Sequence, residues 1–532
     1  MANTKKMHPL AWLMLFMLCM NVGAQNPNFY IYLCFGQSNM EGQGTIETQD
    51  KTVDSRFKVF QALNCSNLGR TKAKWYTAVP PTCQCYSKLS PADYFGRTMV
   101  ANLPDSITVG IINVAVGGCD IRLFDKDIYM DYDSTYKESW FTSKVKDYGY
   151  NPYKYLIDLA KLAQQDGVIK GILLHQGETN TGDAQWPTYV KKIYNDMLAD
   201  LSLKADSVPI LAGEVLAAAG NCCSSMNSII KRLPDTIPTA HVISSAGCAG
   251  QDYAHFNSEG YRKLGRRYGA TMLSLMGLEA AYAEAECGTV GKNWKTLADK
   301  NASNGAYVTQ TAAQNNTASA PSSEDNIIQM SISVSADTSY YLYGRFNNAS
   351  ANSNAFWVKV DDAEFELFDN LTTTGWQWLE LKKLDLTAGE HKIYVGFAKD
   401  SAMLDKICLK NAQKLPVDVA EEAANLCTPS ITPDPTQVGV TAKDGYALYQ
   451  NFPNPVNNCS TIITFHIPQT SFVSLKVYNS QGLEIKELAG RTFTSGEHNI
   501  TFNIEKLSPG AYFYTLRAGQ FSSTQKMIIP VE

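Results

Sequence analysis

The chain has 532 residues, more than a single hydrophobic core usually organises, and we therefore expect two to four domains. Its formal net charge of -5 argues against nucleic acid as a partner. With 45% hydrophobic and 18% charged residues, the composition excludes a largely disordered chain. This balance suits a folded protein that acts on neutral or weakly charged substrates.

Residues 1–24 have the layout of a secretory signal peptide. Lys5 and Lys6 precede an apolar stretch from Leu10 to Met20, and small residues follow before Gln25. The stretch is too short for a membrane span, and no later segment approaches the roughly 20 apolar residues that a transmembrane segment needs. We expect a protein that is secreted or held at the cell surface.

The cysteines predict disulfides rather than a zinc site. Of the 13 cysteines only Cys19 lies in the signal peptide, and the mature chain enters an oxidising compartment. The pairs Cys83-Gln84-Cys85 and Cys222-Cys223 have the wrong spacing for zinc, so structural bridges, with Cys65 and Cys248 as further partners, are the expected use. Their connectivity stays open.

Residues 28–280 alternate short apolar runs with amphipathic stretches, which indicates an α/β domain with a parallel sheet and helices on both faces. The ligand crevice of such a sheet lies beyond the carboxyl ends of its strands. The expected strands are Phe29–Phe35, Val109–Val116, Val168–His175, Pro209–Val215 and Ala240–Ser244. The expected helices include Pro152–Gln164 and Tyr189–Leu203.

The remaining chain reads as two β domains. Residues 283–411 contain runs that alternate at period two, which predicts a β-sandwich. These runs are Ser339–Phe346, Ala355–Phe368, Trp376–Leu386 and His391–Phe397. Prolines over 412–443 predict a linker, and 444–532 is again all-β with several turn signals.

A serine between two glycines marks the candidate nucleophile. The segment Gly36–Gly42 reads GQSNMEG and directly follows the first expected strand. A serine in that position can turn sharply outward and leave its hydroxyl at the mouth of a crevice. The same residue types also form ordinary turns, so the rest of the chain has to decide.

The candidate base is the histidine of an Asp-x-x-His segment. An activated serine needs a base, and His175, His241 and His255 lie in the same domain as Ser38. Asp252 precedes His255 by three residues, so its carboxylate can bend back to Nδ1 and leave Nε2 free for the serine. The alternative is that Asp252 only caps a turn. We expect His175 to be a positioning or core residue and His241 to be structural.

Two further loops supply candidate hydrogen-bond donors. Paired glycines at 117 and 118 follow an expected strand and allow backbone N–H groups to point together at an oxyanion. Gln176 and Glu178 follow another strand and supply an amide and an acid.

These four blocks occur in the order of the SGNH (GDSL-like) hydrolase superfamily, and the domain most resembles the sialate O-acetylesterase and acetyl xylan esterase group, carbohydrate esterase family six. The resemblance implies an α/β/α three-layer parallel sheet and the following roles: Ser38 nucleophile, His255 general base, Asp252 orienting acid, Gly118 and Gln176 oxyanion donors, and Glu178 a supporting residue. The Asn that the superfamily places in its third block is absent, so Gln176 follows from the narrower family. Asn180 stands where many relatives have Asp.

The implied reaction is acyl transfer without a metal or organic cofactor. The favoured substrate is an acetylated polysaccharide, with xylan as the leading example. An O-acetylated sialic acid is the alternative within the enzyme class. An inactive surface carbohydrate-binding protein is the alternative outside it.

The second domain resembles the carbohydrate-binding β-sandwiches of families six and thirty-five. The resemblance implies a structural calcium ion, for which Glu284, Glu286 and Asp405 are the expected ligands. Cys287 and Cys408 adjoin the same two strands, so we expect a bridge between them.

Aromatic rings suit sugar rings, and three are candidates for a sugar cleft: Tyr307, Trp357 and Trp376. Alternation places Trp376 and Trp378 on one face, and tryptophan in a sandwich also packs in the core.

The last domain resembles the Ig-like C-terminal sorting domain of type IX secretion substrates. The resemblance rests on YQNFPNP at 449–455 and on the ending that runs from Gly510 to Ile529. It implies the type IX secretion machinery as a partner and a site of action outside the cell.

Overall fold

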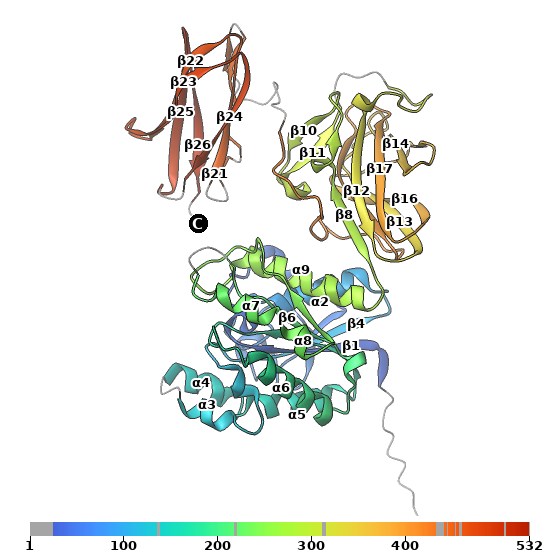
Figure 1. Cartoon of the computed structure of the whole chain (residues 1–532), viewed down its shortest axis with the longest axis vertical. Helices are drawn as coiled ribbons and strands as arrows, with labels where there is room; N and C mark the ends of the chain where they lie inside the picture. Colours follow the sequence, from blue (N-terminus) through green and yellow to red (C-terminus); the bar gives the residue numbers. More distant parts are fainter. Residues whose placement is uncertain are drawn as a thin grey trace, which may run out of the picture.

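The computed structural model describes residues 25–530 except 136–138, 218–220, 311–314, 432–440, 444, 453, 457–459 and 505–506. The expected signal peptide lies outside the described residues. Figure 1 shows an α/β domain, a β-sandwich above it and a second β domain at the C-terminal end.

A sheet of seven described strands forms the N-terminal domain, in the order β3-β2-β4-β1-β5-β6-β7. All neighbours pair in parallel except β3, which runs antiparallel to β2. The strands are β1 (Asn26–Gly36), β2 (Phe57–Phe60), β3 (Trp75–Thr77), β4 (Thr108–Ala115), β5 (Gly167–His175), β6 (Ile210–Gly213) and β7 (Ala240–Ile243). The five predicted strands are confirmed, and the two short edge strands were not anticipated.

Helices cover both faces of this sheet, as Figure 1 shows. Side chains of β1 alternate between the two cores, with Ile31, Leu33 and Phe35 on one face and Tyr32 and Cys34 on the other. The first core contains residues of α5 and α6, and the second contains residues of α2 and α9. The helices are α1 (Ser38–Glu41), α2 (Pro91–Asn102), α3 (Tyr129–Thr135), α4 (Ser139–Asp147), α5 (Pro152–Ala163), α6 (Trp186–Asp200), α7 (Asn227–Ile230), α8 (Leu233–Thr236) and α9 (Ser258–Leu275).

The strand register brings distant parts of the sequence to one edge of the sheet. Gly36 at the end of β1 pairs with Ala115 at the end of β4 and with His175 at the end of β5. The loops that follow these three strands carry Ser38, the paired glycines and Glu178, and they therefore begin beside one another.

The β-sandwich consists of two sheets whose facing side chains form one core. One sheet has the order β10-β11-β18-β13-β16, with β8 paired to β18, and the other has the order β15-β14-β17-β12-β9. The strands are β8 (Ala280–Glu284), β9 (Thr289–Val290), β10 (Lys295–Ala298), β11 (Ala306–Thr309), β12 (Ile327–Val334), β13 (Thr338–Phe346), β14 (Phe356–Val360), β15 (Glu366–Phe368), β16 (Gln377–Leu386), β17 (Gly389–Phe397) and β18 (Met403–Lys410).

The described part of the C-terminal domain forms two further antiparallel sheets, β19-β20-β21-β24 and β23-β22-β25-β26. Strictly alternating buried side chains on β21 and β26 face a shared core. The strands are β19 (Thr441–Lys443), β20 (Tyr446–Leu448), β21 (Ser460–Ile467), β22 (Ser471–Asn479), β23 (Glu484–Phe493), β24 (Gly496–Asn503), β25 (Gly510–Ala518) and β26 (Phe521–Ile529).

The linker predicted over 412–443 is not free at its beginning. Lys414 donates to the Leu103 carbonyl at 2.6 Å, and Glu422 pairs with Lys263 of α9 at 2.8 Å. Lys406 of the sandwich donates to the Glu421 carbonyl at 2.6 Å. We call residues 414–427 the strap because they contact both domains. The strap contains no helix or strand, yet it packs against both domains, and the predicted linker ends in strand β19.

The disulfides differ in part from the prediction. Cys287 is bonded to Cys427 at the end of the strap, and the expected partner Cys408 is free and buried. Cys408 lies on the outer face of its sheet, in a cluster with Tyr282 and Trp378 that the strap residue Ala423 covers. A cysteine that is close in the sequence pattern of the strands can therefore have its side chain on the face of the sheet from which it cannot reach its expected partner.

The other predicted cysteines divide into bonded and free residues. Cys65 is bonded to Cys85, and Cys222 is bonded to Cys223. Cys83 and Cys248 are free and buried, so the expected bridge at Cys248 does not form.

We expect non-reducing peptide mapping of the purified protein to recover Cys287 linked to Cys427 and Cys408 as a free thiol. Cys427→Ala should lower the free energy of unfolding by about 2–4 kcal/mol, because the bond closes a long loop in the unfolded chain. Recovery of a peptide in which Cys287 is linked to Cys408 would contradict this connectivity.

Candidate active site

The turn after β1 places Ser38 at the edge of the sheet. Gly36 has φ +147°, and a Cβ added there would lie 2.0 Å from the His175 carbonyl oxygen. The Gln37 N–H donates to the same oxygen at 3.0 Å, and α1 begins at Ser38. Only glycine allows this close approach of two strand ends, which turns the serine out of the sheet.

Ser38, His255 and Asp252 form a continuous line of hydrogen bonds. His255 Nε2 lies 2.9 Å from Ser38 Oγ. His255 Nδ1 lies 2.9 Å from Asp252 Oδ2 and 3.1 Å from Oδ1. With the proton on Nδ1, facing the carboxylate, Nε2 is free to accept the serine proton.

The carboxylate of Asp252 is held in its charged form. Partial burial would raise its pKa, but the N–H groups of Ala254 and His255 and the imidazole lower the pKa below its usual value. Both N–H groups donate to Oδ1, at 2.8 and 2.7 Å. The turn-capping role that the sequence left open therefore coexists with the contact to the imidazole.

The paired glycines lie beside the serine. Gly118 has φ +81°, and a Cβ there would lie 2.8 Å from the ring of Trp140. Within the part of the chain that the structure describes, the backbone N–H groups of Ser38 and Gly118 have no hydrogen-bond acceptor. Two such donors beside a serine hydroxyl suit an oxyanion.

A buried ion pair holds this loop in place. Glu41, which is 2% exposed, accepts the Gly117 N–H at 2.7 Å through Oε2. Its other oxygen lies 2.5 Å from Lys144 Nζ of α4. Sequence inspection did not single out either residue, because 103 positions separate them and neither belongs to a recognisable spacing.

The structure does not place Gln176 as an oxyanion donor. Its side chain is fully buried. Its Nε2 donates to Asn180 Oδ1 at 2.6 Å, and Gln37 Oε1 and Cys119 O are further acceptors, each at 3.1 Å. Its Oε1 accepts from Trp186 at 2.5 Å. Both amide protons are thus used inside the protein, so Gln176 supports the loops around the serine rather than facing the crevice. Asn180 belongs to the same network.

Glu178 lines the crevice with one carboxylate oxygen unused. Its Oε1 accepts from Asn39 at 2.5 Å, while its Oε2 is buried and has no partner among the described residues. Burial raises the pKa of Glu178 above its usual value. His175 is also fully buried, and burial lowers its pKa to about 3, so it is a neutral core residue as expected.

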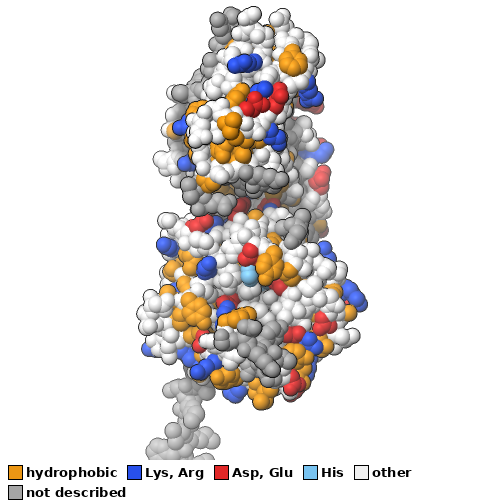
Figure 2. All heavy atoms as spheres, turned by 90° about the vertical axis from the view of Figure 1, so that its left-hand side faces the viewer, with side chains coloured by type: hydrophobic (Ala, Val, Ile, Leu, Met, Phe, Trp, Pro, Cys, Tyr) orange, Lys and Arg blue, Asp and Glu red, His pale blue; other side chains and the backbone are white. Residues whose placement is uncertain are grey.

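A crevice of about 410 Å³ surrounds the serine hydroxyl. Its rim includes the exposed rings of Trp140 and Tyr253, which are 51% and 69% exposed, and the Cys222–Cys223 disulfide. Figure 2 shows a histidine at the surface of this domain beside an acidic and several apolar side chains, which is the setting that the contacts give His255. Trp140 lies on the short helix α4 and Tyr253 on the loop before His255, and neither belongs to a motif that marks a binding residue in the sequence.

In the sandwich, two of the three predicted sugar-binding rings meet. The rings of Tyr307 and Trp376 are 5.2 Å apart, and Trp376 donates to Asp299 at 2.8 Å. Trp357 lies on β14 of the other sheet and donates to the Asn316 carbonyl, so it does not join them. Trp376 is half-buried and Trp378 is buried, because Trp376 precedes β16 and the expected alternation does not reach it.

The predicted calcium ligands also meet. Carboxylate oxygens of Glu284, Glu286 and Asp405 all lie within 4.8 Å of one another. Two cations are already present, because Lys406 lies 3.0 Å from Glu284 and Arg345 pairs with Asp405.

Comparison with known protein families adds to this geometry. Residues 28–274 match the family described as carbohydrate esterase, sialic acid-specific acetylesterase. The match covers a little under half of the chain and marks the α/β domain as a carbohydrate esterase domain. Residues 450–530 match the secretion system C-terminal sorting domain, which directs the esterase to secretion or to the cell surface.

Solved structures show partial likeness. A protein from Arabidopsis thaliana is 17% identical, with 47% of this chain and 99% of that chain covered and a TM-score of 0.36. An exo-beta-1,3-galactanase from Phanerochaete chrysosporium is 22% identical over 25% of this chain and 29% of that chain, with a TM-score of 0.21. A Podospora anserina GH26-CBM35 beta-(1,4)-mannanase is 16% identical over 26% of this chain and 29% of that chain, with a TM-score of 0.21.

No helix among the residues described for the esterase combines the length and the apolar character that a bilayer span requires.

We expect Gly36→Ala to destabilise the esterase domain by about 3 kcal/mol, because the new Cβ must push two strand ends apart and occupy a disfavoured φ. Gly69→Ala is the matched control, since Gly69 has φ +63° but no atom within 4 Å of the new Cβ. It should cost only about 1 kcal/mol. Chemical denaturation measures both, and equal losses would show that the close approach is unimportant.

Proposed function

We propose that this chain is a secreted serine esterase of the SGNH type, which removes O-acetyl groups from an acetylated polysaccharide. The observation that carries the proposal is the line of hydrogen bonds from Asp252 through His255 to Ser38. A solvated histidine or a simple turn cap needs no serine hydroxyl at 2.9 Å. The same contact argues against an inactive binding protein.

In the proposed reaction, Ser38 Oγ attacks the acetyl carbonyl while His255 Nε2 takes the hydroxyl proton. The N–H groups of Ser38 and Gly118 stabilise the oxyanion. His255 then gives its proton to the departing sugar oxygen, which leaves as a hydroxyl and leaves an acetyl group on Ser38. His255 next takes a proton from water as the water attacks this acetyl-enzyme, and it returns that proton to Ser38 Oγ as acetate is released.

The remaining residues keep these groups in register. Asp252 holds the imidazole in the tautomer that leaves Nε2 free and stabilises the imidazolium that forms. Glu41 fixes the Gly117–Gly118 loop through the Gly117 N–H. Each step uses side chains and backbone of this chain and needs no cofactor.

Charge in the crevice favours a neutral sugar, such as an acetylated xylose of xylan. Among the described residues that line the crevice, Lys144 is the lysine or arginine, and Glu41 neutralises it at 2.5 Å. A sialic acid carries a carboxylate that would need an unpaired cation. The family description names sialic acid, so an O-acetylated sialoside remains the second candidate substrate.

An acetate-release panel tests the proposal. The purified protein should release acetate from acetylated xylan faster than from an O-acetylated sialoside. Ser38→Ala should abolish hydrolysis of every ester, and Asp252→Asn should lower kcat by about a hundredfold or more, because the wrong imidazole tautomer is favoured. Ser66→Ala and Asp235→Asn, which change exposed residues that do not line the crevice, serve as matched controls. Normal turnover in Ser38→Ala protein would refute the mechanism.

We further propose that the sandwich is a carbohydrate-binding module of the family six and thirty-five type. The adjacent rings of Tyr307 and Trp376 offer a surface on which a sugar ring can stack. Binding there would raise the concentration of polymer near the esterase crevice.

The acidic cluster of the sandwich fits a calcium ion. Oε2 of Glu284 and Oε2 of Glu286 are buried and have no partner among the described residues. Burial raises the pKa of Glu286 to about 8 and that of Asp405 to about 7. An ion held by these three carboxylates would supply positive charge and remove this cost.

The ion and the pH should therefore act together on stability. Because the folded pKa values of Glu286 and Asp405 lie above those of the unfolded chain, the ion-free protein should lose stability as the pH rises from about 4, and the loss should be complete above pH about 8. Calcium binds the ionised carboxylates, so it should raise the Tm of the sandwich by about 3–5 °C, mainly above pH 7. Scanning calorimetry with EDTA or with calcium measures this. Glu286→Gln should remove the response, and a Tm independent of calcium at pH 8 would contradict the proposal.

A further inference from the structure

Two adjacent cysteines, bonded to each other, form part of the crevice wall. Both Cys222 and Cys223 line the crevice that contains Ser38 and His255. Cys222 is exposed, whereas Cys223 is only 7% exposed. The disulfide thus presents one sulfur to solvent in the crevice and anchors the other in the protein.

This bond has little to contribute to stability as a cross-link. A disulfide stabilises a fold mainly by closing a loop in the unfolded chain, and the effect grows with the length of the loop. Cys65–Cys85 spans 20 positions and Cys287–Cys427 spans 140, but Cys222–Cys223 spans one. A role at its own location is therefore needed to account for it.

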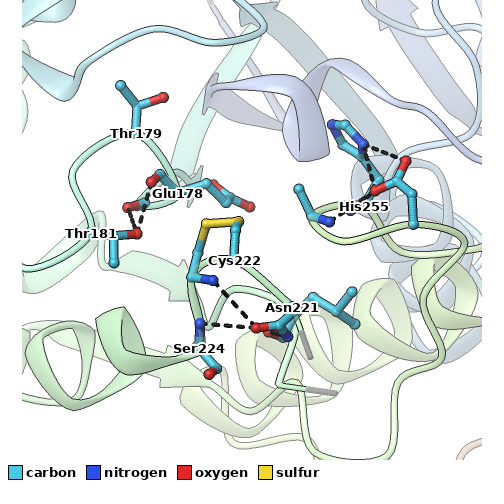
Figure 3. Close-up of a disulfide and its surroundings, with 12 residues drawn as sticks. Glu178, Thr179, Thr181, Asn221, Cys222, Ser224 and His255 are labelled. Atoms are coloured by element: carbon cyan, nitrogen blue, oxygen red, sulfur yellow. Dashed lines mark hydrogen bonds and ion pairs between the residues drawn. A yellow bond between two sulfur atoms is a disulfide. The ribbon is translucent and has the colours of Figure 1, made fainter. Parts of the chain in front are cut away.

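Hydrogen bonds fix the position of the disulfide relative to the imidazole. The Cys222 N–H donates to the Tyr253 carbonyl at 2.9 Å, which ties it to the loop that carries His255. Asn221 Oδ1 accepts the N–H groups of Cys223 and Ser224 at 3.3 and 3.1 Å. Figure 3 shows the sulfur atoms near the space between Glu178 and His255.

The chemistry of this wall suits the face of a sugar ring. A disulfide has no N–H or O–H donor and a soft, polarisable surface, so it packs well against apolar C–H groups. The short covalent ring that it closes removes side-chain freedom before a ligand binds, so little entropy is lost on binding. Trp140 of α4 supplies a second apolar surface, beside Gly118.

We propose that the Cys222–Cys223 disulfide is a substrate-binding surface, which packs against the apolar face of the sugar that carries the scissile acetyl group. The inference rests on the proposed function and deepens it, because it assigns specificity to a covalent feature beside the nucleophile. The xylose ring of an acetylated xylan offers such a face, whereas a small activated ester does not.

The test compares two disulfide variants on two substrates. Cys222→Ala/Cys223→Ala should raise KM for an acetylated xylo-oligosaccharide about tenfold, a change expected for a lost apolar contact. Its kcat/KM for p-nitrophenyl acetate should fall by a clearly smaller factor, because that ester lacks the sugar ring. The matched control, Cys65→Ala/Cys85→Ala, removes a disulfide outside the crevice and should keep the wild-type ratio of the two kcat/KM values. Equal ratios in both variants would overturn the inference.

A second variant and a binding measurement make the test independent of folding and of turnover. Cys222→Ser/Cys223→Ser keeps the size of the side chains without the bond and replaces the alanine variant if that variant does not fold. Calorimetric titration of the oligosaccharide into Ser38→Ala protein, with and without the serine pair, should show about tenfold weaker binding when the bond is absent. If the wild-type protein releases no acetate from any glycan, the proposed function fails, and this titration alone decides the inference: unchanged affinity overturns it.

Discussion

The contact between the end of β1 and the end of β5 is the constraint on which the site depends. Gly36 lets the β1 backbone pass against the His175 carbonyl, and the chain can only continue by turning out of the sheet. That turn exposes Ser38 and starts α1. The loops after β4 and β5 begin at the same edge of the sheet. The strand register alone therefore places the paired glycines and Glu178 close to the serine. His255 lies on a different loop, directly before α9. Asn257 caps the N-terminus of α9 and so helps to fix the position of that loop.

Those parts of the structure that depend on local sequence were predictable. Buried parallel strands read as continuous apolar runs, and the three-residue spacing of Asp252 and His255 is itself the geometry of their contact. The contacts of Gln176 do not support its predicted role as an oxyanion donor, because the direction of its amide depends on Trp186 and Asn180, which fill the space around it. Likewise, Cys287 was paired with Cys408 because the two adjoin the same two predicted strands, whereas its real partner comes from a segment without regular structure. The position of a residue along a strand predicts which residues it contacts within the sheet. It does not predict which face of the sheet a loop will cover.

In and around the described part of the crevice, several ionisable groups are paired or shifted toward their neutral forms. Glu41 and Lys144 cancel, His175 is neutral, and burial favours the protonated form of Glu178. Asp252 is the group whose charge is actively maintained, and it faces the imidazole rather than the ligand. In such surroundings few other charges act on the negative charge that develops on the acetyl oxygen. Two backbone N–H groups can therefore stabilise the transition state strongly.

The strap has a mechanical consequence. Ion pairs at Lys263 and Arg267 join it to α9, while the Cys287–Cys427 bond joins it to the sandwich. The two domains are therefore braced together instead of swinging on a loose tether. A polymer bound to the sandwich would approach the hydroxyl of Ser38 from one direction and at one distance from the binding surface. Acetyl groups would then be cleared from short neighbouring stretches of a strand, in a pattern set by the spacing of the two domains, rather than at random along its length.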